Sequence, residues 1–256
     1  MIRLRAPFAA AALALALGLA AGDAAAAGLN LYAGDCGAGT PATSVTNACT
    51  LNAGSAFRLI GSVVLPTGTI PQFSGCESIL DVQTDATGTI QDWWRADACR
   101  ASGFAAQADS LVIGGACATV WDHAAPQGTT LNALFADGAP PDRLRFLIET
   151  TVDPTVAPGA TLVGDGVTER SVFAFTALRA NSNGPGACVG CNSPACLVLQ
   201  EIGIRTLLDA GGTHMRITDV QSNRSVNYNG SLTTAVCPSS VPVRQRTWGM
   251  LKSLYR

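Results

Sequence analysis

Cysteines are the most reactive group of side chains in this sequence, and three of the nine lie close together. Cys188, Cys191 and Cys196 have the spacing C-x2-C-x4-C, which is compatible with a metal site, a redox-active pair or disulfides. No histidine lies nearby, so a zinc site would need a distant fourth ligand. The glycines and prolines between residues 184 and 194 indicate a loop, not the strand–helix unit of a thioredoxin-like site. We therefore expect disulfides and no metal.

A framework of four disulfides and one free thiol accounts for all nine cysteines. Closure over short loops favours Cys36–Cys49 and Cys99–Cys117. The remaining four candidates would then pair among themselves: Cys188, Cys191, Cys196 and Cys237. We expect Cys76 to be the free thiol, because on a strand it shares one face with Leu80 and Val82, and a buried free cysteine behaves as a small apolar residue.

Catalytic motifs are absent from the sequence. It contains no H-E-x-x-H, P-loop, EF-hand loop or G-x-S-x-G nucleophile elbow. Among the short segments of the sequence, Trp121-Asp122-His123 is the strongest candidate for catalysis, and it would carry the chemistry of an extracellular hydrolase. The four glutamates, Glu77, Glu149, Glu169 and Glu201, each lie in a strand-like segment, which usually places the side chain in solvent. No catalytic residue is therefore assigned, and we expect a protein that is not an enzyme.

Several aspartates are candidates for a calcium site. Asp81, Asp85, Asp92 and Asp97 lie in one stretch, and Asp165 lies between two glycines. Calcium binds several oxygen ligands that converge from loops. Aspartates in such positions also form turns, which is the interpretation we favour, so no cofactor is expected.

Adjacent tryptophans, Trp93 and Trp94, are the candidate ligand-binding residues. Neighbouring side chains on a strand point to opposite faces, so one indole would enter the core and the other would face out. An outward indole between Asp92 and Arg95 would stack on a sugar ring or on an aromatic group of a partner. The alternative, which we favour because tryptophan is usually largely buried, is that both tryptophans pack beneath loops.

The C-terminal segment 247–256 is basic and amphipathic. Thr247 is suited to cap a short helix that places Trp248, Leu251 and Tyr255 on one stripe, with Lys252 and Arg256 beside it. This tail either docks on a surface or secretion partner, or folds back onto the sheet of its own domain.

Residues 1–27 have the pattern of a secretory signal peptide. A positive start with Arg3 and Arg5 precedes an apolar run, and Ala25-Ala26-Ala27 matches the cleavage site. The chain is thus expected to be secreted or extracytoplasmic, in the periplasm or at the cell surface, with no membrane span after cleavage. Charged residues make up only 13% and the net charge is −2, so nothing favours a nucleic-acid partner.

The elements that position these residues are predicted to be mostly strands. Apolar residues recur with a period of two in 57–65, 76–84, 143–149, 171–178, 196–206, 215–218 and 226–234, between Gly-, Pro-, Asn- and Asp-rich breaks. Segment 128–136 is expected to form a short helix. About seven to nine strands predict an antiparallel Ig-like β-sandwich with long disulfide-tied loops, in a single domain over residues 28–246.

Scattered motifs resemble a poorly characterised group of exported bacterial proteins. The shared features are an N-terminal pair (Cys36 and Cys49), Trp93-Trp94 near Cys99-Arg100, the segment Gly186–Cys196, and the tail Trp248–Arg256. The sandwich also resembles cohesin-like modules at the level of fold. Neither resemblance implies a known activity.

The sequence therefore favours an exported, non-enzymatic module for binding, adhesion or cell-surface assembly. Its partner would be a component of the cell envelope, a secretion partner or a polysaccharide. The alternatives are a carbohydrate-binding module that uses an exposed tryptophan and, third, an extracellular hydrolase.

Overall fold

Long strands form where the sequence alternates between apolar and polar residues. A computed structural model describes residues 27–36, 42–84, 90–96, 99–108, 117–122, 126–134, 143–152, 160–208, 213–231 and 237. The predicted strands are confirmed as β3 (Ser55–Val64), β5 (Phe73–Thr84), β9 (Arg143–Val152), β11 (Glu169–Leu178), β12 (Ala195–Thr206) and β13 (Thr213–Ile217). The predicted strand 226–234 is shorter, because β14 covers Ser225–Tyr228.

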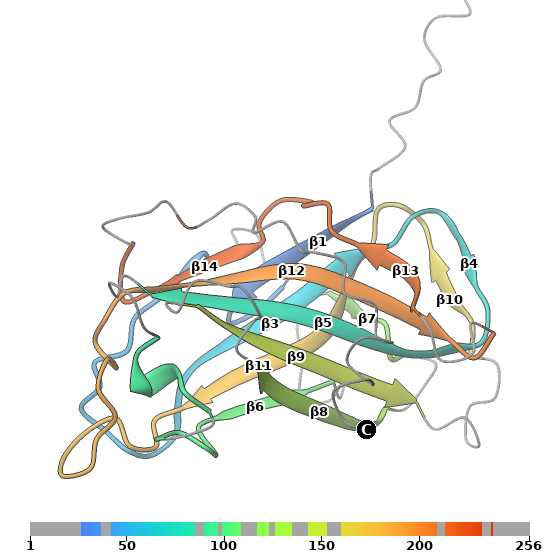
Figure 1. Cartoon of the computed structure of the whole chain (residues 1–256). Helices are drawn as coiled ribbons and strands as arrows, with labels where there is room; N and C mark the ends of the chain where they lie inside the picture. Colours follow the sequence, from blue (N-terminus) through green and yellow to red (C-terminus); the bar gives the residue numbers. More distant parts are fainter. Residues whose placement is uncertain are drawn as a thin grey trace, which may run out of the picture.

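Two large sheets make up the molecule (Figure 1). Sheet A has the strand order β1-β3-β11-β6, and β7 pairs with β11. Its strands that were not predicted from the sequence are β1 (Gly28–Ala33), β6 (Phe104–Gln107) and β7 (Ala118–Thr119). Sheet B has the strand order β2-β14-β12-β5-β9-β8, and β13 pairs with β12. Its strands that were not predicted from the sequence are β2 (Ser44–Val45) and β8 (Pro126–Leu134). A small ribbon of β4 (Gly68–Ile70) and β10 (Leu162–Gly164) lies at one end. The expected all-β sandwich is confirmed.

The core lies between the two sheets, where the inward residues of the long strands meet. Phe57 and Phe175 on sheet A face Phe146 on sheet B, with ring centroids 5.1 Å apart for Phe146 and Phe175. Cys76 belongs to this core beside Leu80, and burial raises the pKa of its thiol well above the usual range. Cys76 is the free thiol, as predicted.

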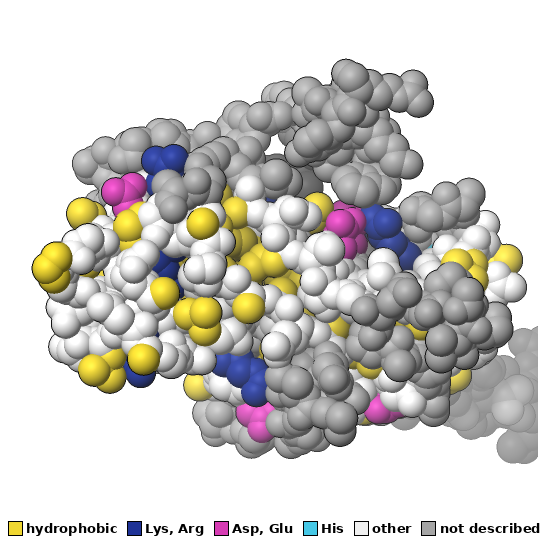
Figure 2. Space-filling model, turned by 90° about the horizontal axis from the view of Figure 1, so that it is seen from below, with side chains coloured by type: hydrophobic (Ala, Val, Ile, Leu, Met, Phe, Trp, Pro, Cys, Tyr) yellow, Lys and Arg dark blue, Asp and Glu magenta, His cyan; other side chains and the backbone are white. Residues whose placement is uncertain are grey.

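One side of the sandwich is closed by the chain that connects β13 to β14. Its backbone pairs with the free edge of β1: Leu29 N donates to Asp219 O at 2.8 Å, and Leu31 N donates to Asn223 O at 2.7 Å. On the other side, β6 and β8 lie next to each other along the lower edge in Figure 1. Seen from that edge, the described surface is mostly uncharged, in keeping with the low content of charged residues (Figure 2).

Residues 128–134, the described part of the segment predicted to form a helix, belong to a strand, so that prediction is wrong. Residues 126–134 form β8, which pairs with β9 from Pro126↔Val152 to Leu134↔Arg145. Two neighbouring threonines, Thr129 and Thr130, favour a strand, and the ladder with β9 overrides a weak helical pattern. Among the described residues no helix is long and apolar enough to cross a membrane.

The disulfides join distant segments: Cys36–Cys117, Cys49–Cys191, Cys99–Cys188 and Cys196–Cys237. The predicted pairs Cys36–Cys49 and Cys99–Cys117 are therefore wrong. Of the four C-terminal cysteines expected to pair with one another, only Cys196 and Cys237 do so. The reason is that strand order, not distance along the chain, decides which cysteines meet. Cys36 after β1 and Cys117 before β7 meet over the outer side of sheet A, beside Ile60 and Ala174.

The close approach of the backbone of β3 to a buried ring gives a stability prediction. A Cβ atom on Gly61 would lie 2.1 Å from Cε1 of Phe173. We expect Gly61→Ala to lower the free energy of unfolding by about 1–3 kcal/mol, because the ring must shift within a packed core. Gly128→Ala on β8 is the matched control, since its Cβ would meet nothing within 4 Å. Urea denaturation that finds both variants equally stable would contradict this packing.

Candidate functional site

Trp93 and Trp94 lie in a single turn of 3-10 helix, η1 (Asp92–Trp94), and not on a strand. Both side chains are 0% exposed, so the favoured interpretation that both tryptophans are packed inside is confirmed, and the exposed indole of the ligand-binding hypothesis is wrong. The turn is fixed because Trp93 N donates to Val189 O at 2.9 Å and Trp94 N donates to Gln91 O at 2.9 Å. Of the two flanking candidates, Asp92 is exposed and Arg95 is half-buried.

The two indoles complete the aromatic core at one end of the sandwich. The ring of Trp93 stacks on Tyr228, with centroids 5.2 Å apart, and meets Trp94 edge to face at 4.8 Å. Trp93 Nε1 also donates to Ser182 Oγ at 3.0 Å. Because these faces are used inside the protein, they offer no stacking surface to a sugar.

Arg100 is a buried cation that the sequence did not single out for this role. Its guanidinium lies 4.0 Å from the ring centroid of Trp93 and donates to the carbonyl oxygens of Gly103, at 3.0 Å, and Leu178. Burial lowers the pKa of Arg100 to about 10. Within the described part of the chain it contacts no carboxylate, so ring faces and carbonyl dipoles hold the charge.

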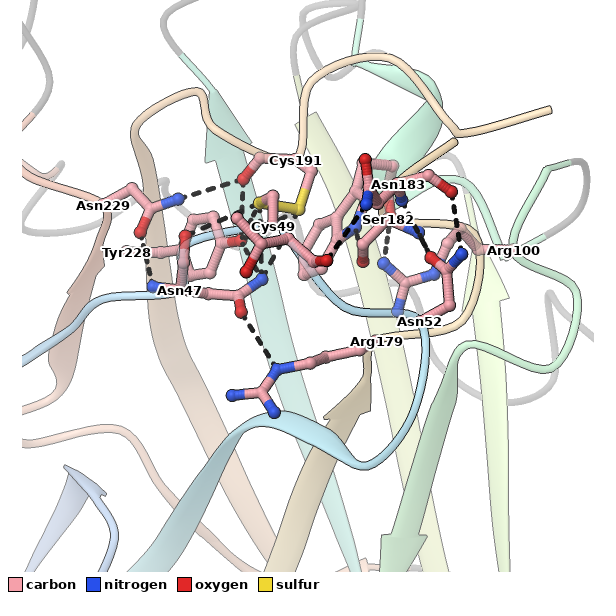
Figure 3. The surroundings of a disulfide bond; sticks show 12 residues. Asn47, Cys49, Asn52, Arg100, Arg179, Ser182, Asn183, Cys191, Tyr228 and Asn229 are labelled. Carbon is pink, nitrogen blue, oxygen red and sulfur yellow. Dashed lines mark hydrogen bonds between the residues drawn. A yellow bond between two sulfur atoms is a disulfide. The ribbon is translucent and has the colours of Figure 1, made fainter. Parts of the chain in front are cut away.

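Two disulfides clamp this aromatic end (Figure 3). Cys99–Cys188 ties the chain that follows η1 to the loop before β12, and Cys49–Cys191 ties the same loop to the N-terminal segment. Each cysteine of the C-x2-C pair thus bonds to a different segment, as expected for disulfides that stabilise a fold and not for a redox-active pair.

A buried asparagine completes the clamp. Asn47 Nδ2 donates to Tyr228 OH at 3.2 Å, and Asn47 Oδ1 accepts from Arg179 Nε at 3.3 Å (Figure 3). Tyr228 OH in turn donates to Cys191 O at 2.7 Å. The predicted ligand-binding region is therefore a buried structural cluster, in which Trp94 Nε1 and Arg100 Nε have no hydrogen-bond partner among the described residues.

A different set of polar residues comes together on the side of sheet B that faces away from the core. We call it the ionic face. It comprises charged residues on β5, β9, β12 and β13: Glu77, Asp81, Arg143, Arg145, Glu149, Glu201, Arg205 and Arg216. Strand register aligns them, because Glu77 lies opposite Glu149 and Asp81 lies opposite Arg145.

Ion pairs connect the four strands of the ionic face. Arg145 binds Asp81 through two hydrogen bonds, from Nε at 2.7 Å and from Nη2 at 2.8 Å. Arg205 binds Glu77, and its Nη2 also lies 3.5 Å from Glu149 Oε1. Arg216 on β13 binds Glu201. Charge-assisted, two-point contacts of this kind hold the side chains in fixed positions.

Two carboxyl groups of the ionic face have raised pKa values. Burial raises the pKa of Glu149, and the nearby negative charge of Glu77 raises it further, while Arg205 lowers it. Burial also raises the pKa of Glu201, which Arg216 partly offsets. Burial is therefore the main reason that the pKa values of Glu149 and Glu201 are raised.

An apolar centre separates the ion pairs of the ionic face. Ile79 and Leu147 lie opposite each other on β5 and β9, between the Glu77–Glu149 and Asp81–Arg145 rows. They are only 9% and 7% exposed, although they point away from the core cluster. On β12, Val198 and Cys196 form a separate small cluster with Cys237.

The positions of the glutamate side chains differ from those expected from the sequence. Three of the four lie together on the ionic face, and Glu201 is only 4% exposed, so the prediction of a solvent-facing side chain is wrong for it. Glu169 lies on sheet A, where it accepts hydrogen bonds from Asn30 Nδ2 at 2.6 Å and Ser62 Oγ at 2.5 Å. Period-two patterning showed the strands of these residues, but not which strands would be neighbours.

The aspartates considered for calcium act in other ways where they are described. Asp81 pairs with Arg145, and Asp165 caps a turn by accepting from the backbone N–H groups of Val167 and Thr168, at 2.9 and 2.7 Å. Those hydrogen bonds hold the pKa of Asp165 below its usual range. The described residues include no group of three or more His, Cys, Asp or Glu side chains placed to hold a metal ion. Asp85 and Asp97 lie outside the described residues.

Other sequence-based candidates also lie outside the described residues. These are His123, the signal segment up to residue 26, and the C-terminal tail 247–256 with its expected short helix. Trp121, the neighbour of His123, is buried and its Nε1 donates to Val172 O at 2.8 Å. In comparisons with known proteins, no family model, no curated protein and no solved structure matches the chain.

The burial of the tryptophans leads to a test of their role. Trp93→Ala should lower the free energy of unfolding by about 3–5 kcal/mol, because it opens a large cavity beside Tyr228. Asp92→Ala, one residue earlier and exposed, should change it by less than about 0.5 kcal/mol. Urea denaturation measures both variants. Loss of a sugar affinity in Trp93→Ala without loss of stability would overturn the structural role.

The raised pKa of Glu149 predicts a pH-dependent effect of its removal. Because the pKa of Glu149 is higher in the folded state than in the unfolded chain, the protonated side chain favours folding. This stabilisation is present at low pH and is lost as the pH rises through the folded-state pKa. Glu149→Gln, which mimics the protonated acid, should thus be more stable than the natural chain at pH 7, with the difference disappearing near pH 4. Asp92→Asn is the control. Thermal unfolding that shows Glu149→Gln to be less stable at pH 7 would contradict this electrostatic account.

Proposed function

We propose that the protein is an exported, non-enzymatic module that binds a component of the cell envelope through the ionic face of sheet B. The observation that carries the proposal is the fixed array of charges across four strands, around the apolar pair Ile79 and Leu147. Interfaces use such preorganised charges to select a partner and fix its orientation. Arg216, whose side chain is 40% exposed, is the most accessible charge among the ion pairs of the array.

Export is supported by the signal-like segment 1–27 together with four disulfides. Disulfides form and persist outside the cytoplasm, so the proposed location is the periplasm, the cell surface or the medium. An Ig-like or cohesin-like sandwich is the finer description that we propose for the fold. Folds of this type serve many functions, so the proposal rests on the face and not on the fold.

The ionic face also supports binding over hydrolysis. Glu77 and Glu149 are adjacent carboxylates, as glycosidases require, but both contact the same guanidinium of Arg205. The proposed partner is an envelope component, secretion partner or polysaccharide with charges complementary to the array, and no cofactor is proposed.

Binding to isolated cell envelopes tests this function. We expect the labelled mature protein to bind saturably, and Arg216→Gln to weaken the affinity about tenfold, or ~1.4 kcal/mol. Arg170→Gln on β11 of sheet A is the matched control and should bind like the natural chain. Equal binding by all three proteins, or no saturable binding, would contradict the proposal. Turnover of a substrate that is lost in His123→Ala would instead favour the extracellular hydrolase.

A further inference from the structure

We infer that a polar pocket between β13 and β14 binds an acidic sugar, with Arg224 holding the carboxylate of the sugar. The pocket has a volume of about 440 Å³. It is lined by the chain that connects β13 to β14, by Ser225 at the start of β14, and by Cys237. None of these residues belongs to the ionic face, so the inference goes beyond the proposed function and does not depend on it.

The pocket forms where β13 and β14 share one edge of β12. β13 pairs with residues 202–205 of β12, and β14 pairs with residues 195–198. The connection between the two strands therefore passes residues 199–201, and it rejoins the edge where Leu199 N donates to Arg224 O at 2.9 Å. Figure 1 shows β13 and β14 beside β12, with the connection running between them along the upper side.

Hydrogen bonds and a disulfide fix the wall of the pocket. Asn30 Oδ1 on β1 accepts from Ser222 N at 2.8 Å and from Asn223 N at 3.2 Å. Cys237, another part of the wall, is bonded to Cys196 of β12. A site that is already ordered loses little conformational entropy when a ligand binds, which favours binding.

Arg224 is the only cation among the described residues that line the pocket. In contrast to Arg145, Arg205 and Arg216, its guanidinium forms no ion pair or hydrogen bond within the described part of the chain. The residue is half-buried, and this burial lowers the pKa of Arg224. A guanidinium that is partly removed from water and has no carboxylate partner favours an anionic ligand, which it can bind through two parallel hydrogen bonds.

The other lining groups favour an acidic sugar over a simple anion. Asp219 is exposed, and its carboxylate accepts hydrogen bonds from hydroxyl groups but repels a doubly charged phosphate. The hydroxyl groups of Thr218 and Ser225 both donate and accept, as the hydroxyl groups of a sugar do. The described lining includes no aromatic ring, so charge and hydroxyl contacts, and not stacking, would hold the ligand.

Titration of the isotope-labelled, oxidised mature protein, followed by nuclear magnetic resonance, tests the inference. Sodium glucuronate should cause saturable shifts in the amide signals of residues 218–225 and Cys237, and glucose should bind about tenfold more weakly, because it has no carboxylate. Arg224→Gln should weaken the binding of glucuronate about tenfold. Arg170→Gln on β11 is the matched control and should bind glucuronate like the natural chain.

A second variant keeps the charge of the pocket. Arg224→Lys retains the cation but not the two-point contact, so its affinity for glucuronate should lie between those of the natural chain and Arg224→Gln. Unchanged amide signals elsewhere in the protein show that each variant is folded.

Equal binding of glucose and glucuronate, shifts confined to residues outside the pocket, or no saturable shift would overturn the inference. Inorganic phosphate is the third probe, and phosphate that binds as tightly as glucuronate would overturn the assignment to a sugar. The titration contains no envelopes, so failure of sugar binding and failure of envelope binding are distinguished.

Discussion

Long-range disulfides are the constraint on which the rest of this structure depends. Cys49–Cys191 and Cys99–Cys188 close loops of 142 and 89 residues, and each closure removes about 4–5 kcal/mol of conformational entropy, expressed as free energy, from the unfolded chain. They hold the loop before β12 against the turn that carries Trp93 and Trp94. That turn closes the aromatic end of the sandwich, and the same loop leads directly into the central strand of sheet B.

Sheet B links the clamp to the ionic face. Its strand β12 begins at the clamp, carries Cys196 near its start, and continues to Glu201 and Arg205 on the outer side. The register that places Glu77 opposite Glu149 is set by inward residues such as Leu80 and Phe146, because a slip by one residue would exchange the two sides of a strand. The apolar core thus determines the geometry of the charged surface behind it.

The sequence predicts the fold class well and the site poorly, for physical reasons. Period-two patterning is a local signal, so β3, β5, β9, β11 and β12 were predictable, and so was the buried thiol of Cys76. Disulfide partners and the ionic face depend on which strands are neighbours, which no local pattern encodes. The hypothesis of an exposed indole at Trp93 or Trp94 failed because it assumed a strand, whereas η1 turns both indoles inward, in agreement with the favoured interpretation that both are packed.

The disulfide map of the oxidised protein tests the central claim most directly. Digestion without reduction, followed by mass spectrometry, should find the linked peptides Cys36–Cys117, Cys49–Cys191, Cys99–Cys188 and Cys196–Cys237. Cys76 should be labelled by a thiol reagent only after unfolding, because it is buried. Local pairs such as Cys36–Cys49 or Cys99–Cys117 would contradict the clamp.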